Sequence, residues 1–395
     1  MGRILWLTAG GRAGSCIGMR PAPVIAIRVD ASLVMGTGHA MRCLTLAEAL
    51  RTQGAQCHFI CRAHPGNLIA TIRQHGFAVT EFSAGAADFK PKSDGRVPLP
   101  AHSQWLGCDW QTDAWQTLEI VQEIKPGWLI VDHYALDLPW EDALAAHAHK
   151  LFVIDDLADR SHRCDMLLDQ NWFGEDTPER YRNLVPSYCK CQLGPEYALL
   201  KLEYAQLRES MPPRDGTVRR MLVFLGGSDA TNQTSKVLEA LMEPSFAHLQ
   251  VDVVIGQNHP DIECVAAQAA TRPGTTLYQD LPTLAPLMVR ADLMISAGGS
   301  TTWERMCLGL PAIVISVAAN QTPPNLALAN AGYIVFLGDK NEVSSPDIAK
   351  AITRCLESPA ALKAQSRLCQ KLVAGDGAQM ICQQLLQGGG VQYAT

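Results

Sequence analysis

The strongest constraint on this chain is a repeated alternation of short apolar runs with longer helical patterns. The first run, Val24 to Val29, is compact and rich in β-branched residues, which is typical of a buried strand. Residues 39–52 follow it with apolar side chains at helical spacing. The same alternation continues along the chain, and it predicts parallel sheets covered by helices.

The alternation forms two series, separated by a stretch around Met211-Pro212-Pro213 that resists regular structure. We therefore expect an α/β protein with Rossmann-like domains at residues 21–205 and 219–395 and a linker at 206–218. The expected strands are 24–29, 56–61, 77–82, 128–132, 151–155, 165–168, 221–225, 251–255, 293–296 and 312–316. The expected helices are 39–52, 66–75, 112–124, 139–148, 232–242, 303–308, 324–331, 346–357, 359–372 and 376–387.

Two segments do not fit the alternation. Residues 1–20 hold a short, glycine-broken apolar stretch, which we interpret as a disordered leader, or as sequence before a start at Met19, rather than as a signal peptide. Residues 84–104 are rich in Gly, Pro and Ser and predict a long loop. The loop could serve as a lid or be a harmless insertion.

The composition excludes several classes of protein. With 47% hydrophobic and 18% charged residues, the 395-residue chain can bury two cores. A net charge of −6 argues against a general nucleic-acid binder. The 13 cysteines are scattered without a C-x-x-C pair, which favours reduced thiols in the cytoplasm and predicts no metal site. No apolar run is long enough to predict a membrane span.

The turn after the first run is the first candidate site. Gly36 and Gly38 open a tight turn into a helix, where free backbone N–H groups form an anion site. His39 lies on this turn and could act as a base toward a phosphorylated ligand, although a histidine there can also be a cap or a surface residue. Arg42 stands close to where a dinucleotide-binding motif needs its third glycine, so we set that interpretation aside.

The second series contains two glycine-rich turns at strand ends. They are Gly226-Gly227-Ser228 and Gly298-Gly299-Ser300-Thr301-Thr302. Ligands of open α/β sheets bind at the carboxyl ends of strands, and both turns offer N–H groups and hydroxyls there. Neither turn continues into the Gly-Lys-Ser/Thr of a P-loop, so P-loop nucleotide hydrolysis is not expected.

Three polar residues follow these turns. Glu304 could accept hydrogen bonds from a ribose diol, or it could form a capping box with Thr301. Both interpretations stay open. Gln321 and Asn325 lie where amides could bind a sugar or a base.

Several motifs together resemble one enzyme family. They are Gly36-Thr37-Gly38-His39, Val131-Asp132-His133-Tyr134, Ile154-Asp155-Asp156-Leu157-Ala158, Leu168-Asp169-Gln170-Asn171, Leu193-Gly194-Pro195-Glu196-Tyr197-Ala198-Leu199-Leu200, Phe224-Leu225-Gly226-Gly227-Ser228-Asp229 and the stretch from Ser296 to Glu304. In this order they resemble the UDP-2,4-diacetamido-2,4,6-trideoxy-β-L-altropyranose hydrolases of pseudaminic acid biosynthesis (the PseG family). The second half is more distantly similar to MurG-type glycosyltransferases of GT-B architecture.

The resemblance implies a GT-B fold and hydrolysis at the anomeric carbon, with inversion, release of UDP, and no metal or other cofactor. It assigns His39 as the base, with Gly36 and Gly38 in its turn, and it places Tyr134 beside the sugar. The turns at 226–228 and 298–301 would bind the diphosphate and Glu304 the ribose. Gln321 and Asn325 would contact the donor sugar, a looser correspondence.

The implied chemistry agrees with general principles. N–H groups at helix starts can stabilise charge developing on the departing UDP, and a neutral imidazole can deprotonate the attacking water. The expected partner is a small-molecule UDP-sugar, with no nucleic acid, membrane or obligate protein partner. The alternatives are a GT-B glycosyltransferase and a non-catalytic UDP-sugar binding protein.

Overall fold

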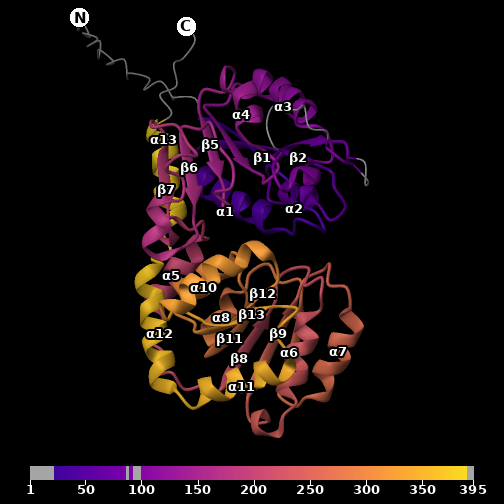
Figure 1. The fold of residues 1–395 in the computed structure, drawn as a ribbon, viewed down its shortest axis with the longest axis vertical. Coiled ribbons are helices and arrows are strands. Elements are labelled where there is room, and N and C mark those ends of the chain that lie inside the picture. Colours follow the sequence, from indigo (N-terminus) through magenta and orange to yellow (C-terminus); the bar gives the residue numbers. More distant parts are fainter. Residues whose placement is uncertain (1–21, 86–88, 92–98, 389–395) are drawn as a thin grey trace, which may run out of the picture.

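The computed structural model describes residues 22–85, 89–91 and 99–388, and it contains two parallel sheets, each covered by helices. The two domains lie one above the other along the long axis of the molecule (Figure 1). The expected leader at 1–20 and most of the central part of the expected 84–104 loop lie outside the described residues. Among the described residues, no helix has the length and apolarity needed to cross a membrane.

The first sheet has seven parallel strands in the order β3-β2-β1-β4-β5-β6-β7. The strands are β1 (Val24–Val29), β2 (Gln56–Arg62), β3 (Ala78–Phe82), β4 (Trp128–Asp132), β5 (Leu151–Ile154), β6 (Met166–Asp169) and β7 (Lys190–Leu193). The helices are α1 (Gly38–Thr52), α2 (Ile69–Gln74), α3 (Trp110–Ile124) and α4 (Leu138–Ala145), with short 3₁₀ turns at Ser103–Leu106, Gly174–Glu179 and Pro195–Tyr197.

Burial on both faces explains why the first sheet reads as continuous apolar runs. One face packs Ile25, Ile27 and Val29 of β1 against α1. The opposite face packs Leu129 and Val131 of β4 against α3 and α4. Val29 pairs with Asp132, so the carboxyl ends of β1 and β4 meet at one edge of the sheet.

The second sheet has six parallel strands in the order β10-β9-β8-β11-β12-β13. The strands are β8 (Arg220–Phe224), β9 (Gln250–Ile255), β10 (Thr275–Gln279), β11 (Leu293–Ala297), β12 (Ala312–Ser316) and β13 (Val335–Asp339). The helices are α6 (Gln233–Leu241), α7 (Ile262–Thr271), α8 (Ala285–Arg290), α9 (Thr301–Cys307), α10 (Thr322–Asn330), α11 (Ser345–Leu356) and α12 (Pro359–Leu372), with 3₁₀ turns at Pro244–Phe246 and Ala319–Gln321.

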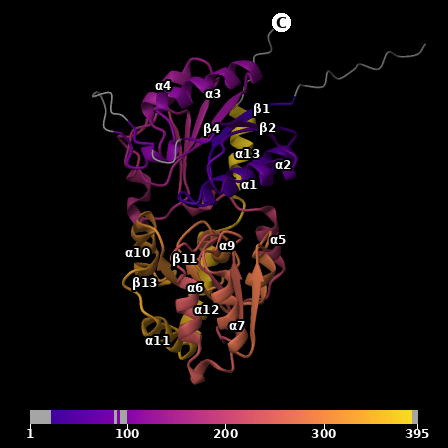
Figure 2. The same cartoon turned by 90° about the vertical axis from the view of Figure 1, so that its right-hand side faces the viewer.

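The connections between the domains differ from the expected boundaries. The helix α5 (Leu202–Ser210) takes up the start of the expected 206–218 linker. The last helix, α13 (Gly377–Gly388), leaves the second domain and packs against the first (Figures 1 and 2). Its Ile381 and Leu385 belong to the same apolar cluster as α1, and the indole N–H of Trp128 donates to the Leu385 carbonyl at 2.9 Å. The chain therefore crosses between the domains twice.

Three strands were absent from the sequence prediction, namely β7, β10 and β13. All three are edge strands, and most of their residues are partly exposed or exposed. An edge strand does not need a continuous apolar run, so the signal that revealed the central strands is missing there. The helices α5, α7 and α8 were also not predicted.

Candidate functional site

His39 lies at the edge of the first sheet, in the first turn of α1. Gly36 makes the turn before it with a φ of +76°, a left-handed conformation that favours glycine. The imidazole Nδ1 lies 2.6 Å from Oδ1 of Asp132, the last residue of β4. Among the described residues no hydrogen bond is made to Nε2, and the His39 side chain is 10% exposed. An aspartate therefore orients this histidine through one ring nitrogen.

Arg42 completes the arrangement one helical turn later. Its Nε donates to Asp132 Oδ2 at 2.6 Å and its Nη2 to Asp132 Oδ1 at 2.7 Å, which is a bidentate ion pair. Its Nη1 donates to Asp156 Oδ2 at 2.6 Å. The Arg42 side chain is nearly buried, so these bonds hold α1, β4 and the end of β5 in one rigid unit.

The charges of this unit stay fixed near neutral pH. Burial alone would raise the pKa of Asp132, but Arg42 and His39 outweigh burial and hold that pKa well below its ordinary value. Burial lowers the pKa of Arg42, yet Asp132 and Asp156 raise it well above its ordinary value. Asp132 is therefore an anion, and it can stabilise an imidazolium on His39.

Tyr134 lies beside His39 as a ring neighbour. The two rings meet edge to face with centroids 4.4 Å apart. The Tyr134 hydroxyl donates to Asp156 Oδ2 at 2.8 Å. Burial, followed by Asp156, raises the Tyr134 pKa well above its ordinary value, so the hydroxyl keeps its proton. Tyr134 and Arg42 thus donate to the same Asp156 oxygen, and the Tyr134 hydroxyl hydrogen is used in this bond.

The turn that carries His39 faces the second domain. A Cβ added to Gly227 would lie 3.5 Å from the Thr37 hydroxyl oxygen, so the 226–228 turn and the 36–39 turn are neighbours. Gly226 adopts a φ of +105°, and a Cβ on Gly256 would overlap the Gly227 carbonyl, so the backbones pack closely here. The structure therefore brings the turn that precedes the predicted base next to one of the two predicted anion-binding turns.

The second turn, 298–301, leads from β11 into α9. A Cβ on Gly298 would overlap the side-chain amide of Asn325. Asn325 is 1% exposed and donates to the Ser316 hydroxyl at 3.3 Å, so it supports the turn from beneath. Gln321 accepts from the Val317 N–H, and its Nε2 lies 3.7 Å from a Cβ added to Gly299. Ser300 occupies the N-cap position of α9 without a side-chain capping bond.

Glu304 does not cap α9. It lies on the side of that helix facing α5, where Tyr204 hydrogen-bonds it and Lys201 and Glu203 are close. Burial, opposed by Tyr204 and Lys201, raises the pKa of Glu304 to about 7. The N-cap residue of α9 is Ser300, so the capping-box interpretation with Thr301 is not supported.

Three partners of His39 and Tyr134 had no role in the sequence prediction. They are Asp132, Arg42 and Asp156. The motifs around Asp132 and Asp156 were singled out, but no spacing rule connects acids from different strands to a histidine on a helix. The usable signal was topology, because the ends of neighbouring parallel strands meet at one sheet edge.

Known structures with the same arrangement identify the fold. MurG of Acinetobacter baumannii superimposes with a TM-score of 0.63 at 14% sequence identity, over 93% of this chain and all of that chain. The structure of Arabidopsis thaliana UGT89C1 complexed with UDP gives a TM-score of 0.62 at 13% identity, over 92% of this chain and 99% of that chain. The fold is GT-B. The predicted architecture is thus confirmed.

The second GT-B domain also matches a family model. Residues 221–381 match the glycosyltransferase family 28 C-terminal domain. This range holds both glycine-rich turns, Glu304, and the start of α13. The predicted distant similarity to MurG-type enzymes is confirmed by this match and by the fold.

Curated relatives of this GT-B protein are distant in sequence. The UDP-2,4-diacetamido-2,4,6-trideoxy-β-L-altropyranose hydrolase of Campylobacter jejuni is 23% identical over 79% of this chain and 98% of its own length. That similarity confirms the resemblance inferred from the motifs. An uncharacterised Methanocaldococcus jannaschii protein is 24% identical over 74% of this chain, and the Bacillus subtilis spore coat polysaccharide biosynthesis protein SpsG is 29% identical over 45%. The aligned parts span 55% and 53% of the lengths of these last two relatives.

Proposed function

We propose that this protein hydrolyses a UDP-linked diacetamido sugar, UDP-2,4-diacetamido-2,4,6-trideoxy-β-L-altropyranose, at the anomeric carbon, releasing UDP. The observation that carries the proposal is the His39–Asp132 pair, whose Nδ1 and Oδ1 atoms lie 2.6 Å apart. His39 follows directly on the turn whose Thr37 lies next to Gly227 of the other domain. The named Campylobacter jejuni relative, aligned over nearly its whole length, supports the choice of reaction and substrate.

The base acts through its second nitrogen. With Nδ1–H donating to Asp132, the lone pair on Nε2 is available to take a proton from water. The water oxygen attacks C1 of the sugar as the bond from C1 to the UDP oxygen breaks. The proton moves to Nε2, and the adjacent Asp132 anion stabilises the imidazolium that forms.

The leaving group is held by the other domain. The 226–228 and 298–301 turns present backbone N–H groups to the diphosphate and stabilise the charge that develops as UDP departs. Glu304 accepts hydrogen bonds from the uridine ribose, and Gln321 faces the donor. The base belongs to the first domain, and the leaving UDP is held by the second. Water therefore attacks C1 from the side opposite UDP, and the anomeric configuration inverts.

A GT-B glycosyltransferase is the second candidate. The observation that favours it is the match of residues 221–381 to the glycosyltransferase family 28 C-terminal domain. His39 would then deprotonate an acceptor hydroxyl instead of water, with the same geometry at Asp132. A protein that only binds the UDP-sugar is the third candidate.

Incubation of the purified protein with the UDP-sugar alone separates these candidates. Hydrolysis predicts rapid UDP release without any acceptor, and NMR of the first-formed sugar should show the inverted anomer. UDP release only after an acceptor is added would favour the transferase. Binding of the UDP-sugar without turnover under either condition would favour the binding protein.

A further inference from the structure

A cluster of aromatic rings continues from His39 through Tyr134 to Trp105 and His102. Trp105 stacks beside Tyr134 with centroids 5.9 Å apart and planes 28° apart. The His102 ring lies 4.3 Å from Trp105 and 5.5 Å from Tyr134. Tyr134 is buried, while Trp105 and His102 are partly exposed. The cluster therefore offers an aromatic surface one ring away from the proposed base.

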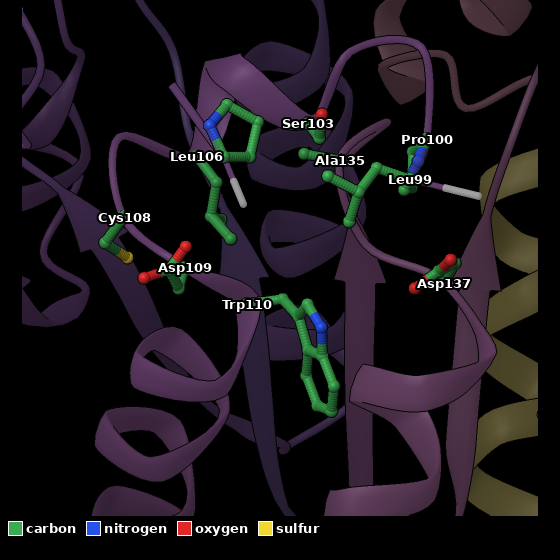
Figure 3. A pocket seen from close by; sticks show the side chains of 10 residues that line it. Leu99, Pro100, Ser103, Leu106, Cys108, Asp109, Trp110, Ala135 and Asp137 are labelled. Atoms are coloured by element: carbon green, nitrogen blue, oxygen red, sulfur yellow. The ribbon is translucent and has the colours of Figure 1, made fainter. Parts of the chain in front are cut away.

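The segment that carries these rings is firmly seated. Leu106 is 1% exposed and packs in the same apolar cluster as Val131 and Trp140. Ser103 and Leu106 line a small pocket together with Ala135, the residue after Tyr134 (Figure 3). The segment thus rests on the connection that follows β4. The rings of Trp105, His102 and Tyr134 form one aromatic surface, which we call the wall.

Two glycines, Gly85 and Gly107, pack against each other beside this segment. A Cβ on Gly85 would overlap the Gly107 carbonyl, and Gly107 has a φ of +73°. A Cβ on Gly107 would also approach the His64 ring to 2.9 Å. Gly85 and Gly107 are therefore in close contact, and this contact fixes the backbone two residues after Trp105.

The three aromatic rings are themselves uncharged near neutral pH. Burial lowers the pKa of His102, Asp159 opposes the shift, and Arg160 and His39 add to it. A neutral imidazole beside an indole and a phenol ring suits apolar groups better than phosphates. The diphosphate is assigned to the other domain, so the chemistry of this wall matches a different part of the substrate.

We propose that Trp105, backed by Tyr134 and flanked by His102, is a specificity-determining residue that contacts the sugar of the donor. The inference rests on the proposed function and names the part of the substrate that this wall contacts. A 2,4-diacetamido-6-deoxy sugar carries three methyl groups, one on each acetamido group and one at C6. Packing these methyl groups against Trp105 favours this sugar over hexoses that carry hydroxyls at the same positions, because hydroxyls would lose hydrogen bonds to water there.

Binding measurements in a His39→Asn background test the inference, because slow turnover leaves the sugar intact. The probes are the UDP-diacetamido sugar and UDP itself. Trp105→Ala should weaken binding of the UDP-sugar about tenfold and leave UDP binding unchanged. Trp105→Phe should restore most of the lost affinity, since a ring is retained. Trp115→Ala is the matched control, because Trp115 is 60% exposed on α3 of the same domain.

Two results would overturn the inference. Unchanged binding of the UDP-sugar to Trp105→Ala would mean that the wall does not meet the sugar. Equal loss of UDP and UDP-sugar binding would mean that the segment only supports the fold. Failure of the proposed function is recognised separately, because wild-type protein would then release no UDP from the sugar, whereas the binding comparison does not require turnover. If neither probe binds the His39→Asn protein, both proposals are contradicted.

Discussion

The two domains share one architecture, yet the sheet edges that face each other are built differently. At the edge of the first sheet, charged side chains dominate. Asp132 joins His39 and Arg42, and nearby Asp113 is bound by two arginines. At the edge of the second sheet, the backbone turns at 226–228 and 298–301 are supported by short polar side chains such as Asn325.

The difference suggests a division of labour within one fold. A rigid network of side chains can hold a single imidazole in one orientation. Closely packed glycine turns can bring N–H groups to an anion that no side chain needs to reach. If this division holds, substitutions in the first domain should reduce turnover, and substitutions in the second should reduce binding of UDP.

Replacing His39 should give the largest effect. For His39→Ala we expect kcat to fall by about 10²- to 10⁴-fold, because the water loses its base, while UDP affinity stays near that of the wild type. Initial rates of UDP release and calorimetric titration with UDP measure the two quantities. The control is His75→Ala, since His75 lies 2.6 Å from Glu48 in a similar but partly exposed pair. Near wild-type turnover of His39→Ala would remove His39 from the mechanism.

Replacing Asp132 should give the next largest effect. Asp132→Asn keeps the shape but cannot stabilise an imidazolium, so we expect kcat to fall about 10²-fold. Loss of the ion pair with Arg42 should also cost about 1–3 kcal/mol of stability, measured by chemical unfolding. Asp113→Asn is the matched control, because Asp113 is equally buried and binds Arg28 and Arg62. It should lose stability without a comparable loss of turnover, and an equal loss of kcat in both variants would contradict a specific role for Asp132.

Gly298→Ala tests the second domain. The added Cβ would overlap the amide of Asn325, so either the 298–301 turn or the Asn325 side chain that supports it must shift. We expect the Kd for UDP to rise about tenfold, with a smaller change in kcat at saturating substrate. Gly127→Ala is the control, because the nearest atom to its Cβ is the Val24 carbonyl oxygen at 3.8 Å. A fall in kcat with unchanged UDP binding would contradict the division of labour.

The pH dependence of UDP binding should give the smallest effect. Burial raises the pKa of Glu304 to about 7, so the carboxylate is ionised above that pH and protonated below it. The anion accepts stronger hydrogen bonds from the ribose hydroxyls than the protonated acid does, so UDP affinity should fall up to about tenfold from pH 8 to pH 6. Glu304→Gln should lose the part of the pH dependence that comes from Glu304. The pH dependence that remains in this variant measures the contribution of the UDP phosphate. Identical profiles for both proteins would exclude Glu304 from ribose binding.

The central strands and their alternation with helices could be predicted from the sequence. A strand buried on both faces requires an apolar run of the kind seen at β1 and β4. The His39 turn and the two glycine turns were found by their local patterns. The partners of His39 were not, since Asp132 lies 93 residues further along the chain. Only the register of β1 with β4 brings the two together. Trp105 was hidden in a stretch without periodicity, where local patterns carry no signal.

The return of α13 to the first domain affects any attempt to divide this protein. A cut in the stretch between the two sheets would not yield two self-sufficient halves, since Ile381 and Leu385 fill part of the core beneath α1. The isolated first domain would expose the apolar side chains that Ile381 and Leu385 cover, and the second domain would carry α13 without its packing partner. A separate peptide of residues 377–388 should therefore bind to the isolated first domain.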